Sequence, residues 1–302
     1  MARVVEREPR GRARGRAALA ALAVVALALT GCDAAGGNPG ASGTRRAAPS
    51  PAPAPAWNTG PRSLAAVGDS ITRGFDACTV LSDCPEVSWA TGSSEEVDSL
   101  AVRLLGAKAA ERSWNHAVTG ARMADVPAQM ERAAAHRPEL VTVMAGANDA
   151  CRSSVGAMTP VADFRAQFEE ALRTLRARLP KAQVFVVSVP DLKRLWSEGR
   201  TNPLGKQVWK LGLCPSMLGD ADALDAAATQ RRNTVRDRVA DYNRVLEEVC
   251  AKDDKCRTDG GAVHGFRFGT GQLSRWDWFH PSVDGQARLA EIAYRAVTAK
   301  GP

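Results

Sequence analysis

The sequence lacks several features that would each point to a class of protein. It contains no Cys-x-x-Cys pair, so a zinc site is the weaker interpretation of its cysteines. Its longest apolar run, residues 17–30, has 14 residues, short of the roughly 20 that a membrane-spanning helix needs. The formal charge of +7 is also misleading. Six arginines and two glutamates give residues 1–31 a charge of +4, which leaves only +3 for the rest of the chain. A balance this small gives no reason to expect a nucleic-acid partner.

The first 31 residues have the pattern of an export signal. A front of six arginines is followed by the 14-residue apolar run, which is the right length for the apolar region of a signal peptide. The run closes with Leu-Thr-Gly-Cys at residues 29–32, which resembles the bacterial lipobox. In that motif the cysteine is acylated and becomes the new N-terminus, so we expect lipidation at Cys32. An ordinary signal peptide cut near Gly31 is the alternative.

The next segment, residues 32–59, is rich in Ala, Gly, Ser and Pro. Such a composition cannot bury apolar surface, so we expect a disordered tether. The remaining residues, 60–302, should form one folded domain, since their length and apolar content suffice for one substantial core. We therefore expect an exported protein, held at the outer face of the cell membrane as a lipoprotein or secreted.

Six cysteines remain once Cys32 is set aside. An even number in an exported chain favours disulfides. Several pairings are possible, and we expect the sequential one, with two short loops and one long loop: Cys78–Cys84, Cys151–Cys214 and Cys250–Cys256.

Strand-like and helix-like patterns alternate along the domain. The expected strands are short apolar runs at residues 64–67, 113–118, 140–144, 184–189 and 263–268. The expected helices lie at residues 93–105, opened by a Ser93–Glu96 capping box, 123–136, 159–179, opened by Thr159-Pro160, 222–250 and 284–299. Residues 191–221 show no clear periodicity and read as a long insertion. The alternation predicts an α/β fold, a three-layer α/β/α sandwich with a mostly parallel central sheet.

In such sheets, ligands bind beyond the carboxyl ends of the strands. Ser70 lies just beyond the first expected strand, in the sequence Gly-Asp-Ser at residues 68–70. A serine hydroxyl becomes a nucleophile only with a base in hydrogen-bond reach and a group that orients the base. The alternative for Ser70 is a turn serine that caps the following helix.

Only four histidines are available as that base. His136 falls in a charged helix end, and His264 lies in a glycine-rich stretch with no acidic neighbour. His280 follows the last expected strand, and Asp277 stands three residues before it. In a tight loop this spacing can bring the carboxylate to Nδ1–H and leave Nε2 facing Ser70. The alternative for Asp277 is a turn aspartate that bonds its own backbone.

Four segments of the domain carry these residues and two further candidates, at residues 68–70, 115–120, 146–149 and 277–280. They resemble, in order, the four sequence blocks of the SGNH (GDSL-type) hydrolases. The exported setting and the even number of cysteines are similar to actinobacterial secreted lipases and esterases of that family. The absence of Gly-x-Ser-x-Gly around Ser70 argues against the α/β-hydrolase elbow.

The resemblance implies a catalytic triad of Ser70, His280 and Asp277. It also implies an oxyanion hole formed by the backbone N–H groups of Ser70 and Gly120 and by the side-chain amide of Asn148. Asn148 has an alternative role as a helix N-cap. Asp149, next to it, is expected to bond loop amides.

The function implied is that of a serine-dependent carboxylic-ester hydrolase that works through an acyl-serine intermediate, without cofactor or metal. Its partners would be a small-molecule or lipid ester and, through the N-terminal lipid, the membrane; we expect a monomer and no nucleic-acid partner. Two alternatives remain: an acetyl-esterase that acts on glycans with the same machinery, and a non-catalytic solute-binding lipoprotein. The insertion at residues 191–221 would set the length of the acyl chain. The aromatic residues beside His280, Trp278 and Phe279 among them, would either line an acyl groove or pack the loop.

Overall fold

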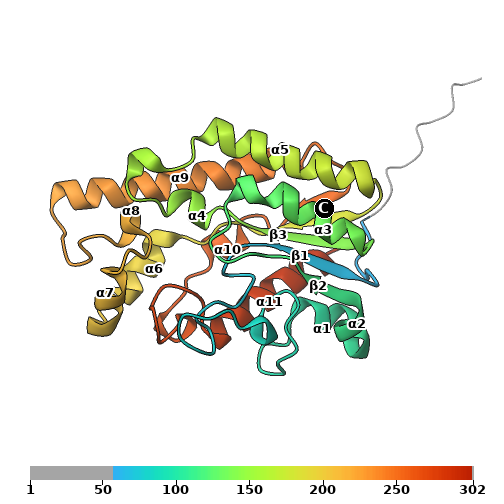
Figure 1. The fold of residues 1–302 in the computed structure, drawn as a ribbon, viewed down its shortest axis with the longest axis horizontal. Helices are drawn as coiled ribbons and strands as arrows, with labels where there is room; N and C mark the ends of the chain where they lie inside the picture. The colour runs from blue at the N-terminus through green and yellow to red at the C-terminus, as the bar shows by residue number, and fades with distance from the viewer. Residues whose placement is uncertain (1–56, 301–302) are drawn as a thin grey trace, which may run out of the picture. The chain divides into compact units, whose positions relative to one another are not determined.

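The computed structural model describes residues 57–300 (Figure 1). The expected signal peptide, Cys32 and most of the expected tether lie outside the described residues. Within residues 57–300, no helix combines the length and the apolar character that a bilayer-spanning helix needs.

A five-stranded, all-parallel sheet forms the centre of the domain, with strand order β2-β1-β3-β4-β5. The strands are β1 (Leu64–Gly68), β2 (Ser113–Asn115), β3 (Leu140–Met144), β4 (Gln183–Val186) and β5 (Cys256–Thr258). Every residue of β1, β3 and β4 is buried. This explains why these strands appear in the sequence as short apolar runs, since a parallel sheet is covered on both faces.

Helices cover both faces of the sheet and complete the predicted three-layer sandwich. Figure 1 shows α3 (Val126–Ala135), α5 (Val161–Arg178) and α9 (Ala226–Cys250) on one face. The other face carries α1 (Leu100–Leu105), α2 (Ala109–Arg112) and α11 (Val283–Thr298). The shorter helices follow the strands: α4 (Ala147–Ala150), α6 (Leu192–Gly199), α7 (Pro203–Trp209), α8 (Pro215–Leu218) and α10 (Ala262–Gly265).

The structure corrects the strand that was predicted at residues 263–268. That segment contains α10 instead, and the fifth strand is Cys256–Thr258. The strand is a three-residue edge strand with only half-buried side chains, so it has neither an apolar run nor an alternation for the sequence to reveal.

Two predicted helix starts are also wrong. The helix expected from Ser93 begins only at Leu100, where the side chain of Ser99 accepts a hydrogen bond from the Val102 N–H. Thr159 does not cap α5, because its hydroxyl donates to the carboxylate of Asp149 instead.

The insertion at residues 191–221 is helical rather than irregular. It folds into α6, α7 and α8, of which the first two are capped by side chains: Asp191 accepts from two N–H groups of α6, and Asn202 from two of α7. Elements of four to eight residues are too short for a 3.6-residue periodicity to stand out in the sequence.

Three disulfides join the cysteines in sequential order: Cys78–Cys84, Cys151–Cys214 and Cys250–Cys256. The second of these is the one that matters for the site. It connects the end of α4 to the start of α8 and so ties the insertion to the carboxyl edge of the sheet.

Candidate active site

The loop after β1 begins at a glycine that no other residue could replace without a shift. Gly68 has φ +150°, and a Cβ at this position would lie 2.2 Å from the carbonyl oxygen of Met144 on the neighbouring strand. The side chain of Gln129 on α3 holds the same residue from both sides. Its amide donates to the Gly68 carbonyl at 2.9 Å, and its oxygen accepts from the Gly68 N–H at 2.7 Å. The end of β1 is therefore fixed in position.

A second glutamine, Gln286 on α11, holds the segment beyond Ser70. Its amide donates to the carbonyl of Ile71 at 2.8 Å, and its oxygen accepts from the Trp89 N–H at 2.9 Å. Both glutamines are buried. No local sequence pattern predicts these two glutamines, because each contact joins residues at least 61 positions apart.

The structure brings Ser70, His280 and Asp277 together. Ser70 Oγ lies 2.9 Å from His280 Nε2, although the two residues are 210 positions apart. His280 Nδ1 is hydrogen-bonded to Asp277 Oδ2. The other carboxylate oxygen accepts from the backbone N–H groups of Phe279 and His280, each at 2.9 Å. The three-residue spacing thus forms a tight loop in which Asp277 bonds its own backbone and the imidazole at once.

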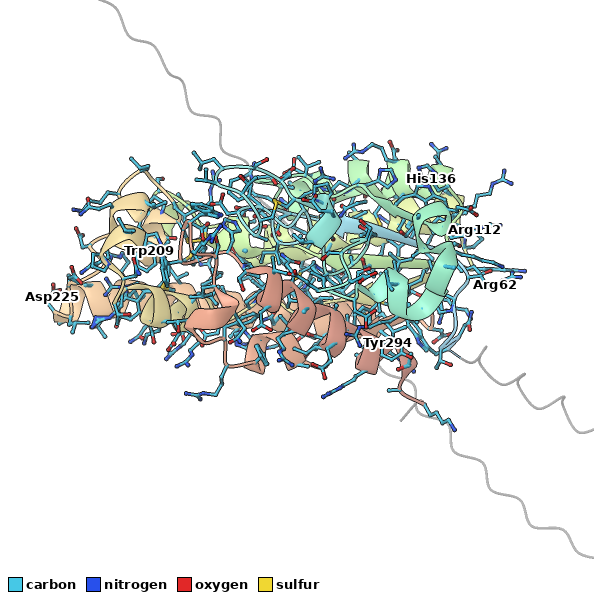
Figure 2. All side chains as sticks on the ribbon, turned by 90° about the horizontal axis from the view of Figure 1, so that it is seen from below. Arg62, Arg112, His136, Trp209, Asp225 and Tyr294 are labelled. Atoms are coloured by element: carbon cyan, nitrogen blue, oxygen red, sulfur yellow. A yellow bond between two sulfur atoms is a disulfide. The ribbon has the colours of Figure 1, made fainter. Side chains whose placement is uncertain are left out.

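The other histidines of the described chain are elsewhere. His136 is exposed and stacks on Trp114 with ring centroids 4.5 Å apart. Figure 2 shows it at the opposite end of the domain from Trp209, whose indole N–H donates to the carbonyl of Asp277 at 2.7 Å. His264 Nδ1 is hydrogen-bonded to the Val189 carbonyl at 3.0 Å.

Burial and charge act in opposite directions on the His280–Asp277 pair. Burial alone would lower the pKa of His280, but the charge and the hydrogen bond of Asp277 outweigh it and hold that pKa above the ordinary 6.5. Burial alone would raise the pKa of Asp277. The charge and hydrogen bond of His280, with the two backbone amides, hold that pKa below its ordinary value instead. The carboxylate is therefore the charged partner of the imidazole.

A further carboxyl lies beside Ser70. Asp69 is almost fully buried, and burial raises its pKa to about 7. One of its oxygens accepts from the Ile71 N–H at 3.0 Å, which stabilises the turn around Ser70.

The candidate oxyanion donors lie on three different segments of the chain, with Asn148 in α4. Gly120 has φ +83°, a conformation that favours glycine. Asn148 Nδ2 donates one hydrogen bond to the Ala121 carbonyl at 3.0 Å, which leaves its second N–H available. Within residues 57–300, the backbone N–H groups of Ser70 and Gly120 have no hydrogen-bond acceptor.

The structure rules out one role that was considered for Asn148, that of a helix N-cap. The N-cap position of α4 is Gly146, so Asn148 lies inside the helix and the alternative of a helix cap is wrong. The neighbouring Asp149 accepts from the Met123 N–H at 2.9 Å and from the Thr159 hydroxyl at 2.8 Å. This confirms the prediction that it bonds loop amides.

A pocket of about 190 Å³ opens beside Ser70. Its polar side is formed by Ser70, Asn148 and His280; Gly120 is not among its lining residues. Its apolar side includes large side chains from the insertion and from the loops around the serine: Leu192, Leu195, Leu213, Ile71 and Phe279. The insertion therefore bounds the space next to the serine hydroxyl.

The aromatic residues beside His280 have separate roles. Phe279 lines the pocket. Trp278 packs instead against Gly205 of α7, where a Cβ would lie 2.8 Å from the indole ring. The loop that carries Asp277 and His280 is thus packed directly against the insertion.

Two groups of side chains in the described part of the chain are close enough to hold a metal ion. In the first, Cys78 and Cys84 are joined in a disulfide and have no free thiolate. The second consists of Asp76, Asp277 and His280, in which the Asp277 carboxylate and the imidazole already bond each other. Asp76 is a residue that the sequence analysis did not single out.

The chain was compared with protein families, curated proteins and solved structures. Residues 64–293 match the family described as GDSL-like Lipase/Acylhydrolase. Among solved structures, the chain is similar to LAE5, an alpha/beta hydrolase enzyme from the metagenome of Lake Arreo, Spain, with 18% identity and a TM-score of 0.48 over 78% of this chain and 94% of that one. It is also similar to an extracellular lipase from Streptomyces rimosus, with 19% identity and a TM-score of 0.45 over 78% and 99%. A search of curated proteins found no match.

We expect the imidazole of His280 to titrate above pH 6.5 and Asp277→Asn to lower its pKa, because the charge of Asp277 is what outweighs burial. A group whose pKa is raised on folding stabilises the fold in its protonated form. That contribution is present below pH 6.5 and is lost as the pH rises through the folded pKa. NMR titration of the ring nitrogens measures the value directly.

Asp259→Asn is the matched control for this titration, since Asp259 is also buried and accepts from backbone amides without contacting His280. A wild-type pKa at or below 6.5, or one that Asp277→Asn leaves unchanged, contradicts the electrostatic account.

Proposed function

The chain belongs to the GDSL-like lipase/acylhydrolase family, and from this premise we propose that it hydrolyses carboxylic esters through an acyl intermediate on Ser70. The family makes it a serine hydrolase of the esterase or lipase type, which argues against the alternative of a solute-binding protein without catalysis. The observation that supports the assignment of Ser70 is its hydrogen bond to His280, at 2.9 Å, with Asp277 on the far side of the imidazole.

In the proposed reaction, Ser70 Oγ attacks the ester carbonyl carbon while His280 Nε2 accepts the hydroxyl proton. Asp277 stabilises the imidazolium that forms. His280 then gives the proton to the leaving alcohol oxygen, the C–O bond breaks, and the acyl group stays on Ser70. A water molecule attacks this ester, with His280 as base again, and the carboxylic acid leaves as the serine hydroxyl is restored.

The negative oxygen that forms in each half of the reaction needs hydrogen-bond donors. We assign this role to the Ser70 N–H, the Gly120 N–H and the free N–H of Asn148. Donors without a partner in the resting protein need little reorganisation when the charge develops. Removal of one such donor typically costs on the order of 100- to 1,000-fold in kcat.

The pocket supports a short acyl group as the substrate. Its volume of about 190 Å³ is below the roughly 300 Å³ at which pockets for drug-sized ligands begin. The pocket is therefore of a size that suits a short acyl group, beside apolar walls from the insertion. This space suits the acetyl group of a glycan ester equally well, so the alcohol part of the substrate distinguishes the two candidate functions.

We also propose that the enzyme acts outside the cell and is held there by a lipid on Cys32. The lipobox-like sequence at residues 29–32 supports the lipid, and the three disulfides support an oxidising compartment. Cys32 itself lies outside the described residues.

Ser70→Ala should lower the kcat/KM for p-nitrophenyl butyrate by about 10⁴-fold or more, because no other group in the pocket offers a nucleophile of this kind. Purified wild type and variant are compared in a steady-state assay. Ser154→Ala, at an exposed serine, is the control and should behave as wild type. Comparable turnover by wild type and Ser70→Ala rules out the acyl-serine mechanism.

Leu213→Ala should extend the accepted acyl chain, because Leu213 is half-buried and lines the pocket. Each additional buried methylene contributes about 0.8 kcal/mol, so the ratio of kcat/KM for hexanoate over butyrate esters, which differ by two methylenes, should rise roughly tenfold. Leu211→Ala is the matched control, since Leu211 is 84% exposed and does not line the pocket. The proposal fails if both variants shift the ratio alike, or if wild type prefers palmitate esters.

Cys32→Ala should release the protein from the membrane fraction into the medium, because the substituted residue cannot be acylated. Fractionation of the producing cells followed by immunoblotting measures the distribution. A membrane fraction that Cys32→Ala leaves unchanged contradicts the lipid attachment. Wild-type protein found in the medium favours the ordinary signal peptide instead.

A further inference from the structure

Asp76 is a buried carboxyl to which neither the sequence nor the proposed mechanism assigns a role. It lies in the loop after β1, has φ +57° and is only 1% exposed. The backbone N–H donates to the Ser82 carbonyl at 3.0 Å, and the side chain accepts from the Leu81 N–H. These contacts fix the direction in which the carboxyl points.

The same residue is connected to the loop that carries the candidate triad. The hydroxyl of Ser274 donates to the Asp76 carbonyl at 2.6 Å, and the Ser274 N–H donates to the carbonyl of His280 at 2.7 Å. Asp76 is thus connected to the Asp277–His280 loop through Ser274.

The side chains of Asp76, Asp277 and His280 lie close together in the interior of the domain. The carboxylate oxygens of Asp76 and Asp277 and a ring nitrogen of His280 all lie within 4.8 Å of one another. Asp277 already accepts from His280 Nδ1 and from two backbone amides. Two buried carboxyls this close favour a state in which one of them keeps a proton and donates it to the other.

The proton belongs on Asp76. Burial, the charge of Asp277 and a hydrogen bond with that carboxyl raise the pKa of Asp76 to about 6. The pKa of Asp277, by contrast, lies below its ordinary value. Three carboxyls, of Asp277, Asp76 and Asp69, face the imidazole, and the charge of each raises the pKa of His280.

We propose that Asp76 is a positioning residue for the Asp277–His280 pair: while protonated it donates a hydrogen bond to the Asp277 carboxylate, and once ionised it places a second buried negative charge beside His280. This inference rests on the proposed roles of Asp277 and His280. The acid limb of the pH–rate profile then reflects the coupled titration of Asp76, Asp277 and His280 rather than that of His280 alone.

Asp76→Asn separates the effect of the hydrogen bond to Asp277 from the effect of the negative charge beside His280. The amide still donates to Asp277 and still accepts from the Leu81 N–H, but it carries no charge. The plateau of kcat/KM near pH 8 should therefore stay within about threefold of wild type. The acid limb, and the His280 pKa measured by NMR, should move to lower pH by about one unit, because a charge close to the imidazole has been removed.

Asp76→Ala removes the acceptor of the Leu81 N–H as well as the charge. This loosens the loop that Ser274 connects to the Asp277–His280 loop, and the plateau should fall about tenfold or more. Asp83→Asn is the matched control. It removes one negative charge from the adjacent loop, which the Cys78–Cys84 disulfide closes, but Asp83 pairs with Arg73 at 3.0 Å and does not belong to the group of Asp76, Asp277 and His280. Its acid limb should coincide with that of wild type.

The inference is overturned if the acid limb and the His280 pKa of Asp76→Asn coincide with those of wild type, as a purely structural role would require. The NMR titration decides this even if Asp76→Ala does not fold. Ser70→Ala is assayed in parallel: if it keeps its turnover, the proposed function has failed. If it is inactive and only the Asp76→Asn profile is unmoved, the role of Asp76 alone has failed.

Discussion

The candidate active site depends on one hydrogen bond, between Ser70 and His280, which joins a loop near the start of the domain to a loop near its end. A parallel sheet makes this possible, because its strands all deliver their following loops to the same edge. The bond also requires that both loops are held in place. Gln129 is hydrogen-bonded to the end of β1, Gln286 is hydrogen-bonded to the segment beyond Ser70, and Trp209 donates to the carbonyl of Asp277. These three buried side chains position the hydroxyl and the imidazole.

Electrostatics determines what this geometry can do. The site collects buried carboxyls around one imidazole, an arrangement that is costly unless protons and backbone amides compensate the charge. Asp277 receives that compensation from the imidazole and two amides, whereas Asp69 and Asp76 have raised pKa values. The carboxylate of Asp277 is therefore charged and bonded to the imidazole, whereas the carboxyls of Asp69 and Asp76 change protonation near neutral pH. Such a site couples its charge to pH more strongly than a triad with a single carboxyl.

Much of the fold could be predicted from the sequence, because buried parallel strands such as β1 and β3 are continuous apolar runs. The edge strand β5 and the short helices of the insertion could not, since three to eight residues give no periodicity and depend on tertiary contacts. In the site, Ser70, Asp277 and His280 could be named from residue type, order and spacing. Asp76 could not, because its role arises from a positive-φ turn and from contacts with residues about 200 positions away.

The most direct test of the central claim is to label the protein with an organophosphonate that mimics the ester and to locate the adduct by peptide mass spectrometry. Such a reagent reacts with a serine only where a neighbouring base and an oxyanion site activate it. The account predicts one adduct, on Ser70, which disappears in His280→Ala. An adduct on another serine, or an unlabelled Ser70 in a protein that still hydrolyses esters, would contradict it.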